Sequence, residues 1–174
     1  MDKWSRYWDN ICEIYFLTKH YLLLAEELSE DFDTVFQPVK EHRDAFDHVA
    51  RVYGYKLLKD DIKDIESYRS ANMRKAVGHA YRAFFDTADF LSYVCRRKIR
   101  ELLQGKSREE IIQKYPQYED SRRLLNELPE KIAKIRENKD VSDDECELVK
   151  EVEEYRIILD DLLKIYKTIN RIFG

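Results

Sequence analysis

The sequence predicts an all-α protein, an antiparallel helical bundle of about five to six helices with a long central helix and a long C-terminal helix. Its 174 residues include only 4 Gly and 3 Pro, a composition that favours helices over sheet. Charged residues make up 38% of the chain, and apolar residues recur at threes and fours, as on one face of a helix. We expect a single domain over residues 1–174, because this length suffices for one core.

The first helix is expected over Lys3–Glu30, where apolar residues follow helical spacing. Asp31–Thr34 offers cap residues for a second helix, in which Pro38 is tolerated only near the start. That helix is expected to end near Gly54, because glycine readily takes up the conformation of a C-cap.

The long central helix is expected to begin near Asp61, or only after Ser70, and to end at Gly105. One face of it is apolar throughout and predicts the centre of the core. The residues of this face are Val77, Ala80, Tyr81, Phe84, Ala88, Leu91, Cys95 and Leu102.

Two capping boxes divide the C-terminal part of the chain. Ser107–Glu110 predicts a short helix that stops before Pro116, and Ser142–Glu145 predicts the start of the last helix. Between them a helix is expected over Glu119–Asn138, with Pro129 breaking or kinking it.

The last helix carries a heptad pattern, in which apolar residues alternate spacings of four and three. This row consists of Leu148, Val152, Tyr155, Leu159, Leu162, Tyr166, Ile169 and Phe173. Such a row packs along the central helix of an antiparallel bundle, or it forms a seam with a protein partner or a second copy of the chain. Both interpretations remain open at this point.

The cysteines indicate a reducing compartment. Cys12, Cys95 and Cys146 are odd in number, far apart and without C-x-x-C spacing, which favours buried thiols over a disulfide framework or a zinc site. No apolar run approaches the ~20 residues of a membrane span, and the first residues do not resemble a signal peptide. We therefore expect a cytoplasmic protein with no membrane partner, no metal and no cofactor.

Two segments combine arginine with histidine at the same spacing. Arg43 precedes His48, and Arg74 precedes His79, each pair with four residues between its members. Arginine binds phosphate oxygens and histidine transfers protons near neutral pH, so the combination suits chemistry on a phosphodiester.

On the second helix, Ala45, Phe46, Val49 and Tyr53 are expected to face the core. His42 lies in the middle of this face, which predicts a structural histidine with one buried hydrogen bond.

The opposite side of the second helix gathers Glu41, Asp44 and His48, and its Asp44 and His48 are one turn apart. Arg43 is rotated about 140° from His48 around the helix axis. Only the length of its side chain would let both reach one phosphate. A solvated face crossed by ion pairs is the alternative.

On the central helix, polar residues form a row opposite the core: Lys75, His79, Arg82, Asp86 and Asp89. This row is either a ladder of charges exposed to water, or it faces the polar side of the second helix and builds a cleft in which Glu41, Lys75, His79 and Arg82 bind the substrate. Residues 68–108 hold 10 Lys and Arg against 3 Asp and Glu. The cluster Arg96-Arg97-Lys98 with Arg100 could contact a nucleic-acid backbone or the helix dipole. No aromatic side chain is expected on the same face to stack on bases.

The segment Arg43-Asp44-Ala45-Phe46-Asp47-His48, preceded by Glu41, resembles the Arg-polar-x3-His signature of HEPN domains (higher eukaryotes and prokaryotes nucleotide-binding). The resemblance covers about residues 35–105. It implies a helical bundle, frequently a homodimer, that binds RNA or a nucleotide or cleaves RNA without metal, as in toxin–antitoxin or phage-defence systems. It also implies that Arg43 binds the scissile phosphate, that His48 transfers the proton of the 2′-hydroxyl, and that Asp44 orients His48.

Two other interpretations remain. Glu26-Glu27-Leu28-Ser29-Glu30, followed by Glu41 and Asp44, resembles the carboxylate motifs of MazG-like nucleotide pyrophosphohydrolases, which implies Mg²⁺ bound against a triphosphate. A non-catalytic module that binds a protein partner through the C-terminal heptad helix, or binds a nucleotide, is the other alternative.

Overall fold

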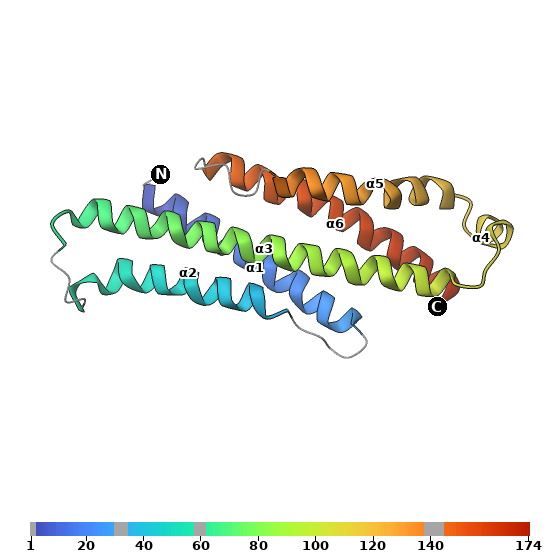
Figure 1. The fold of residues 1–174 in the computed structure, drawn as a ribbon, viewed down its shortest axis with the longest axis horizontal. Coiled ribbons are helices and arrows are strands. Elements are labelled where there is room, and N and C mark those ends of the chain that lie inside the picture. Colours follow the sequence, from blue (N-terminus) through green and yellow to red (C-terminus); the bar gives the residue numbers. More distant parts are fainter. Residues whose placement is uncertain (1–2, 30–34, 58–61, 138–144) are drawn as a thin grey trace. The chain divides into compact units, whose positions relative to one another are not determined.

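The protein is all-α, as the sequence predicts. The computed structural model describes residues 3–29, 35–57, 62–137 and 145–174. In these ranges the chain forms α1 (Lys3–Leu28), α2 (Phe36–Gly54), the short 3₁₀ turn η1 (Tyr55–Leu57), α3 (Ile65–Leu103), α4 (Arg108–Lys114), α5 (Tyr118–Glu137) and α6 (Glu145–Phe173) (Figure 1).

The chain divides into two compact units. The first comprises Met1–Leu24 and Asp33–Ala88, and the second comprises Ala25–Phe32 and Asp89–Gly174. Helices α1 and α3 therefore contribute residues to each unit. The expectation of one domain over residues 1–174 stays a prediction.

The first unit is built from α1, α2 and the N-terminal part of α3. Aromatic side chains of α1 and α3 meet in its core, where the rings of Tyr21 and Phe84 lie 6.3 Å apart. Tyr7, Ile14, Met73 and other apolar residues around them are almost fully buried. Burying such side chains is the main source of stability for helices with amphipathic faces.

The second unit combines the C-terminal part of α3 with α4, α5 and α6, and α5 lies beside α6 (Figure 1). The heptad row of α6 fills its core, because Val152, Tyr155, Leu159, Leu162 and Ile169 are all buried. The hydroxyl of Tyr155 donates a hydrogen bond to Asp89 on α3 at 2.6 Å. The row thus packs within the chain, and a partner seam on this helix stays a prediction.

Local signals explain where the helices of the central segment begin and end. Asp64 caps α3, because its carboxylate accepts a hydrogen bond from the backbone of Ser67 at 3.0 Å. This start at Ile65 lies between the two predicted starts. Gly105 has a φ of 75°, the left-handed conformation that ends many helices. Ser107 caps α4 as predicted, accepting a hydrogen bond from the backbone of Glu110 at 3.1 Å.

Pro129 was predicted to break or kink its helix; the break is wrong, and the kink stays a prediction. Helix α5 continues through this proline, which lies exposed on its surface. A proline removes one helical hydrogen bond, and the packing of Leu128 and Ile132 in the core holds the helix together around it.

Several predicted helix boundaries lie outside the described residues. These are the caps at Asp31–Thr34 and Ser142–Asp144 and the helix ends at Glu30 and Asn138.

The predicted core face of α2 is wrong in part. Ala45 is buried, but Phe46 and Tyr53 are about 70% exposed (72% and 67%), and Val52 and Glu41 are buried in their place. His42 packs edge-on against Tyr15 with ring centroids 5.1 Å apart. It forms this ring contact in place of the predicted hydrogen bond, and burial lowers the pKa of its imidazole.

The exposed side of α2 and η1 carries an apolar row. Its residues follow heptad spacing and are Phe36, Val39, Phe46, Tyr53 and Leu57. We call this set the outer row of α2.

Two further observations bear on the sequence predictions. Cys95 is fully buried in the second unit, and burial raises the pKa of its thiol to about 12. Within the described ranges, no helix is both long and apolar enough to cross a lipid bilayer.

Candidate functional site

The polar residues of α2 and α3 meet within the first unit because the two helices run antiparallel (Figure 1). Glu41 contacts His79, and seven residues further along α2 His48 contacts Asn72, which lies seven residues before His79. A helical side chain leans toward the N-terminus of its own helix. In this antiparallel register His48 and His79 therefore lean toward each other.

Glu41 is the centre of this arrangement. Its Oε2 atom lies 2.8 Å from Nδ1 of His79 and accepts a hydrogen bond from Nε of Arg82 at 2.9 Å. Its Oε1 atom accepts a hydrogen bond from Gln37 at 3.1 Å. Burial alone would raise the pKa of Glu41, but the hydrogen bonds from His79 and Arg82 outweigh it and lower the pKa. The carboxylate is therefore ionised at neutral pH.

The hydrogen bonds of Asn72 fix the tautomer of His48. The amide nitrogen of Asn72 donates to the carbonyl oxygen of Tyr68 at 2.9 Å, so its Oδ1 atom faces His48 as an acceptor. Nδ1 of His48 lies 2.8 Å from that oxygen and must donate to it. In the neutral ring, Nε2 of His48 then carries the lone pair and can accept a proton.

His79 occupies a different environment. Its Nδ1 atom lies 2.8 Å from the carboxylate of Glu41 and 2.7 Å from Nη2 of Arg82. A carboxylate only accepts and a guanidinium only donates, so Nδ1 serves one of them at a time. When Nδ1 carries hydrogen, it donates to Glu41, and in the doubly protonated ring Nε2 carries a second hydrogen that can be transferred.

The two imidazole rings stack on each other. Their centroids lie 5.3 Å apart, with an angle of 25° between the ring planes. Each Nδ1 is engaged by the protein, whereas neither Nε2 forms a hydrogen bond with a protein group in the described ranges. The pair therefore presents one nitrogen that can accept a proton beside one that can donate it.

Arg43 does not contact His48. Its Nε and Nη2 atoms both donate to Oδ1 of Asp44, at 2.9 Å and 2.7 Å, and its side chain is 71% exposed. The hydrogen bond from Arg43 lowers the pKa of Asp44, and the charges of His79 and His48 lower it further. This electrostatic coupling indicates that the Arg43–Asp44 pair lies near the two histidines. Asp44 thus binds Arg43, while Asn72 rather than Asp44 orients His48.

The predicted site residues fall into two groups. Glu41, His79, Arg82 and His48 form one connected cluster, whereas Arg43, Asp44 and Lys75 form no hydrogen bond with it in the described ranges. His79 and Arg82 of the polar row of α3 thus contact α2, but Asp89 of the same row accepts a hydrogen bond from α6, and the cleft stays a prediction. Lys75 is exposed one turn before His79 on the same face.

Sequence reasoning missed Asn72 and Gln37. Asn72 lies seven residues before His79, so the polar row of α3 extends back to it with helical spacing. Gln37 precedes Glu41 by one turn on α2. Helical spacing was the signal that could have identified each of them.

Two carboxylates of the site, those of Glu41 and Asp44, are already engaged by protein groups. Glu41 accepts three hydrogen bonds or ion-pair contacts, and Asp44 accepts two from Arg43. Among the residues that the structure describes, no group of three or more His, Cys, Asp or Glu has the geometry of a metal site. Glu30 of the MazG-like motif lies outside the described ranges. No family model, curated protein or solved structure matches the chain.

Proposed function

We propose that this protein is a HEPN-like ribonuclease that needs no metal ion and uses His48 and His79 as an acid–base pair. The observation that carries the proposal is the stacking of these two rings, with each Nδ1 engaged and neither Nε2 hydrogen-bonded to any residue in the described ranges. The resemblance of residues 43–48 to the HEPN signature supports the same substrate class.

The assignment of roles follows from the hydrogen bonds. His48 takes the proton of the RNA 2′-hydroxyl at Nε2, because Asn72 holds its Nδ1 as the donor. The 2′-oxygen attacks the adjacent phosphorus, and the bond from phosphorus to the 5′-oxygen breaks. His79 donates its Nε2 proton to that leaving oxygen, leaving a 2′,3′-cyclic phosphate and a 5′-hydroxyl.

Positive side chains near the histidines stabilise the charge on the phosphate oxygens. Arg43 has most of its guanidinium exposed to solvent, and Lys75 is exposed one turn from His79. Arg82 instead contacts Glu41 and His79, so we assign it a positioning role.

The test is cleavage of a fluorescent RNA oligonucleotide in EDTA. His48→Ala and His79→Ala should each lower the rate by about 10²–10⁴-fold, the range for loss of general acid–base catalysis. His20→Ala is the matched control, because His20 is an exposed histidine on α1 that is absent from the cluster. Circular dichroism checks that each variant is folded.

Three results would contradict the proposal. A wild-type cleavage rate in His48→Ala would show that His48 is not the general base. Equal cleavage of an oligonucleotide with 2′-deoxyribose would show that the 2′-hydroxyl is not the nucleophile. Activity that disappears in EDTA and returns with Mg²⁺ would favour the pyrophosphohydrolase alternative.

A second function is favoured by the outer row of α2. Its side chains leave on the order of 600 Å² of apolar surface exposed, close to what one partner contributes to a standard interface. The largest apolar patch on a typical soluble monomer is about 300–600 Å², and such patches often bind a partner. We propose that the row pairs with the same row of a second copy, since heptad spacing allows two such helices to pack together.

Light scattering of the purified protein tests this pairing. The wild type should be a dimer, and Phe46→Glu should be a monomer because a charge cannot be buried in an apolar seam. Lys40→Glu is the control, since Lys40 is exposed on α2 but is not part of the row. A monomeric wild type would refute the pairing.

A further inference from the structure

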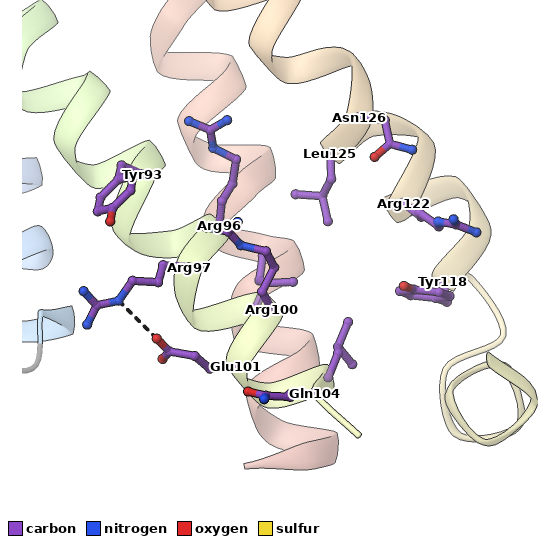
Figure 2. A pocket seen from close by; sticks show the side chains of 12 residues that line it. Tyr93, Arg96, Arg97, Arg100, Glu101, Gln104, Tyr118, Arg122, Leu125 and Asn126 are labelled. Carbon is purple, nitrogen blue, oxygen red and sulfur yellow. Dashed lines mark ion pairs between the residues drawn. The ribbon is translucent and has the colours of Figure 1, made fainter. Parts of the chain in front are cut away.

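The second unit contains a cavity that the proposed ribonuclease site does not use. It has a volume of about 750 Å³ and lies between the C-terminal part of α3 and the first half of α5 (Figure 2). Pockets for small molecules usually have volumes of about 300–1,000 Å³. Side chains from Tyr93–Leu103 on α3, Gln104 just after this helix and Tyr118–Asn126 on α5 line it.

The lining of the cavity is strongly basic. Four arginines line it, against one acid, Glu101; the arginines are Arg96, Arg97, Arg100 and Arg122. Arg97 forms an ion pair with Glu101 at 3.1 Å, which Figure 2 marks with a dashed line. The net charge of the lining is therefore +3, and it attracts an anion.

Three of these arginines lack an ion-pair partner in the part of the chain that the structure describes. Arg96 donates only to the backbone oxygen of Ser92, at 3.2 Å. Arg100 has no hydrogen bond or ion pair, and Arg122 acts on Glu119 only through its charge.

The acids at the start of α5 are held by other arginines. Glu119 pairs with Arg108 at 2.8 Å, and Asp120 pairs with Arg123 at 2.6 Å. Arg96, Arg100 and Arg122 therefore have no acid in the described ranges that balances their charge. A bound anion would supply that opposite charge.

Two tyrosines line the same cavity. Tyr93 is about half exposed and precedes Arg96 and Arg97 by one helical turn, and Tyr118 comes from α5. The expectation that no aromatic residue shares a face with these cations is therefore wrong. Helical spacing already places Tyr93 beside Arg97 and Arg100, while Tyr118 is brought in by the fold. Arginines with aromatic rings form the usual combination for binding phosphate and stacking on a base.

We propose that this cavity binds a nucleoside phosphate, either free or as one nucleotide of a single strand. Arg96, Arg100 and Arg122 bind the phosphate oxygens, and the rings of Tyr93 and Tyr118 provide the surface on which the base stacks. The inference does not depend on the proposed ribonuclease function, because the cavity and the histidine cluster lie in different units.

Isothermal titration calorimetry with ATP, adenosine, inorganic phosphate and a short oligodeoxyribonucleotide, which lacks the 2′-hydroxyl that the proposed ribonuclease needs, tests the proposal. ATP or the oligonucleotide should bind more tightly than phosphate or adenosine alone. The tighter of the two identifies a free nucleotide or a strand as the source of the ligand. Binding should weaken as salt concentration rises, because phosphate contacts are electrostatic.

Variants locate the binding to this cavity. Arg122→Ala and Arg100→Ala should each weaken binding by about tenfold or more, as expected for loss of a charge-assisted hydrogen bond. Arg123→Ala is the matched control, because Arg123 is the next residue on α5 but pairs with Asp120 and does not line the cavity. Tyr118→Ala should weaken ATP binding without affecting phosphate binding, and Tyr118→Phe should retain it.

Several outcomes would overturn the proposal. These are equal binding of phosphate and ATP, wild-type affinity in both arginine variants, or no binding of any nucleotide at low salt. His48→Ala should leave nucleotide affinity unchanged. A loss of affinity there, with Arg122→Ala unaffected, would place the nucleotide in the other unit. Circular dichroism of each variant separates these outcomes from unfolding.

Discussion

Replacing Glu41 with Gln should destabilise the first unit measurably at neutral pH. The substitution keeps the shape of the side chain but removes the charge that His79 and Arg82 share. Hydrogen bonds to charged groups contribute about 1.5–3 kcal/mol each. The Glu41 side chain is only 11% exposed, but Arg82 is 38% exposed, so water recovers part of that interaction. We therefore expect a loss of about 2 kcal/mol in the free energy of unfolding.

Thermal unfolding followed by circular dichroism measures this loss. For a protein of this size, about 2 kcal/mol lowers the Tm by roughly 4–8 °C. Asp47→Asn is the matched control, because Asp47 lies on the same helix in an exposed ion pair with Arg51 and should change the Tm little.

The pH dependence provides a second readout of the same interaction. The folded state lowers the pKa of Glu41 below its ordinary value of 4.5, so its stabilising contribution is complete above that pH. The contribution is lost as the pH falls through the lowered pKa, and the wild type and Glu41→Gln should then converge. Equal Tm values at pH 7, or a difference that grows below pH 4, would refute the reasoning.

Two further substitutions test the second unit. Tyr155→Phe removes the hydroxyl that donates to Asp89, and it should lower the free energy of unfolding by about 1–2 kcal/mol in urea titration; an unchanged midpoint would show that the bond is not formed in solution. Pro129→Ala restores a helical hydrogen bond in α5, but it also increases the conformational entropy of the unfolded chain, which offsets part of the gain. The net effect should be a rise of about 1–2 kcal/mol in the free energy of unfolding. A lower Tm for this variant would indicate that the proline ring packs in the core.

Sequence patterns predicted the features of the fold that depend on neighbouring residues. Ser107 and Gly105 mark helix ends through contacts within a few residues, and both were identified correctly. The apolar face of α3 was also identified, because its spacing continues over many turns. The break expected at Pro129 was wrong because tertiary packing outweighed a local signal.

The orientation of α2 could not be predicted in the same way. This helix has apolar residues on two sides, and Phe46 and Tyr53 looked as suitable for the core as Ala45 and Val52. The buried side is decided by Glu41, whose partners His79 and Arg82 lie 38 and 41 residues away in sequence. Helical spacing on one element carries no information about such distant pairs. A contact between the polar row of α3 and the polar side of α2 was therefore only one of two open interpretations.

The buried thiol of Cys95 provides an intrinsic probe of how the second unit opens. With a pKa of about 12 and no access to solvent, it should resist alkylation for as long as the surrounding helices stay packed. Peptide mass spectrometry can separate the alkylation of Cys95 from that of the partly accessible Cys12. The rate at Cys95 would then report how often the buried face of α3 becomes exposed, without any engineered label. If nucleotide binding stabilises this unit, added ATP should slow that reaction at Cys95.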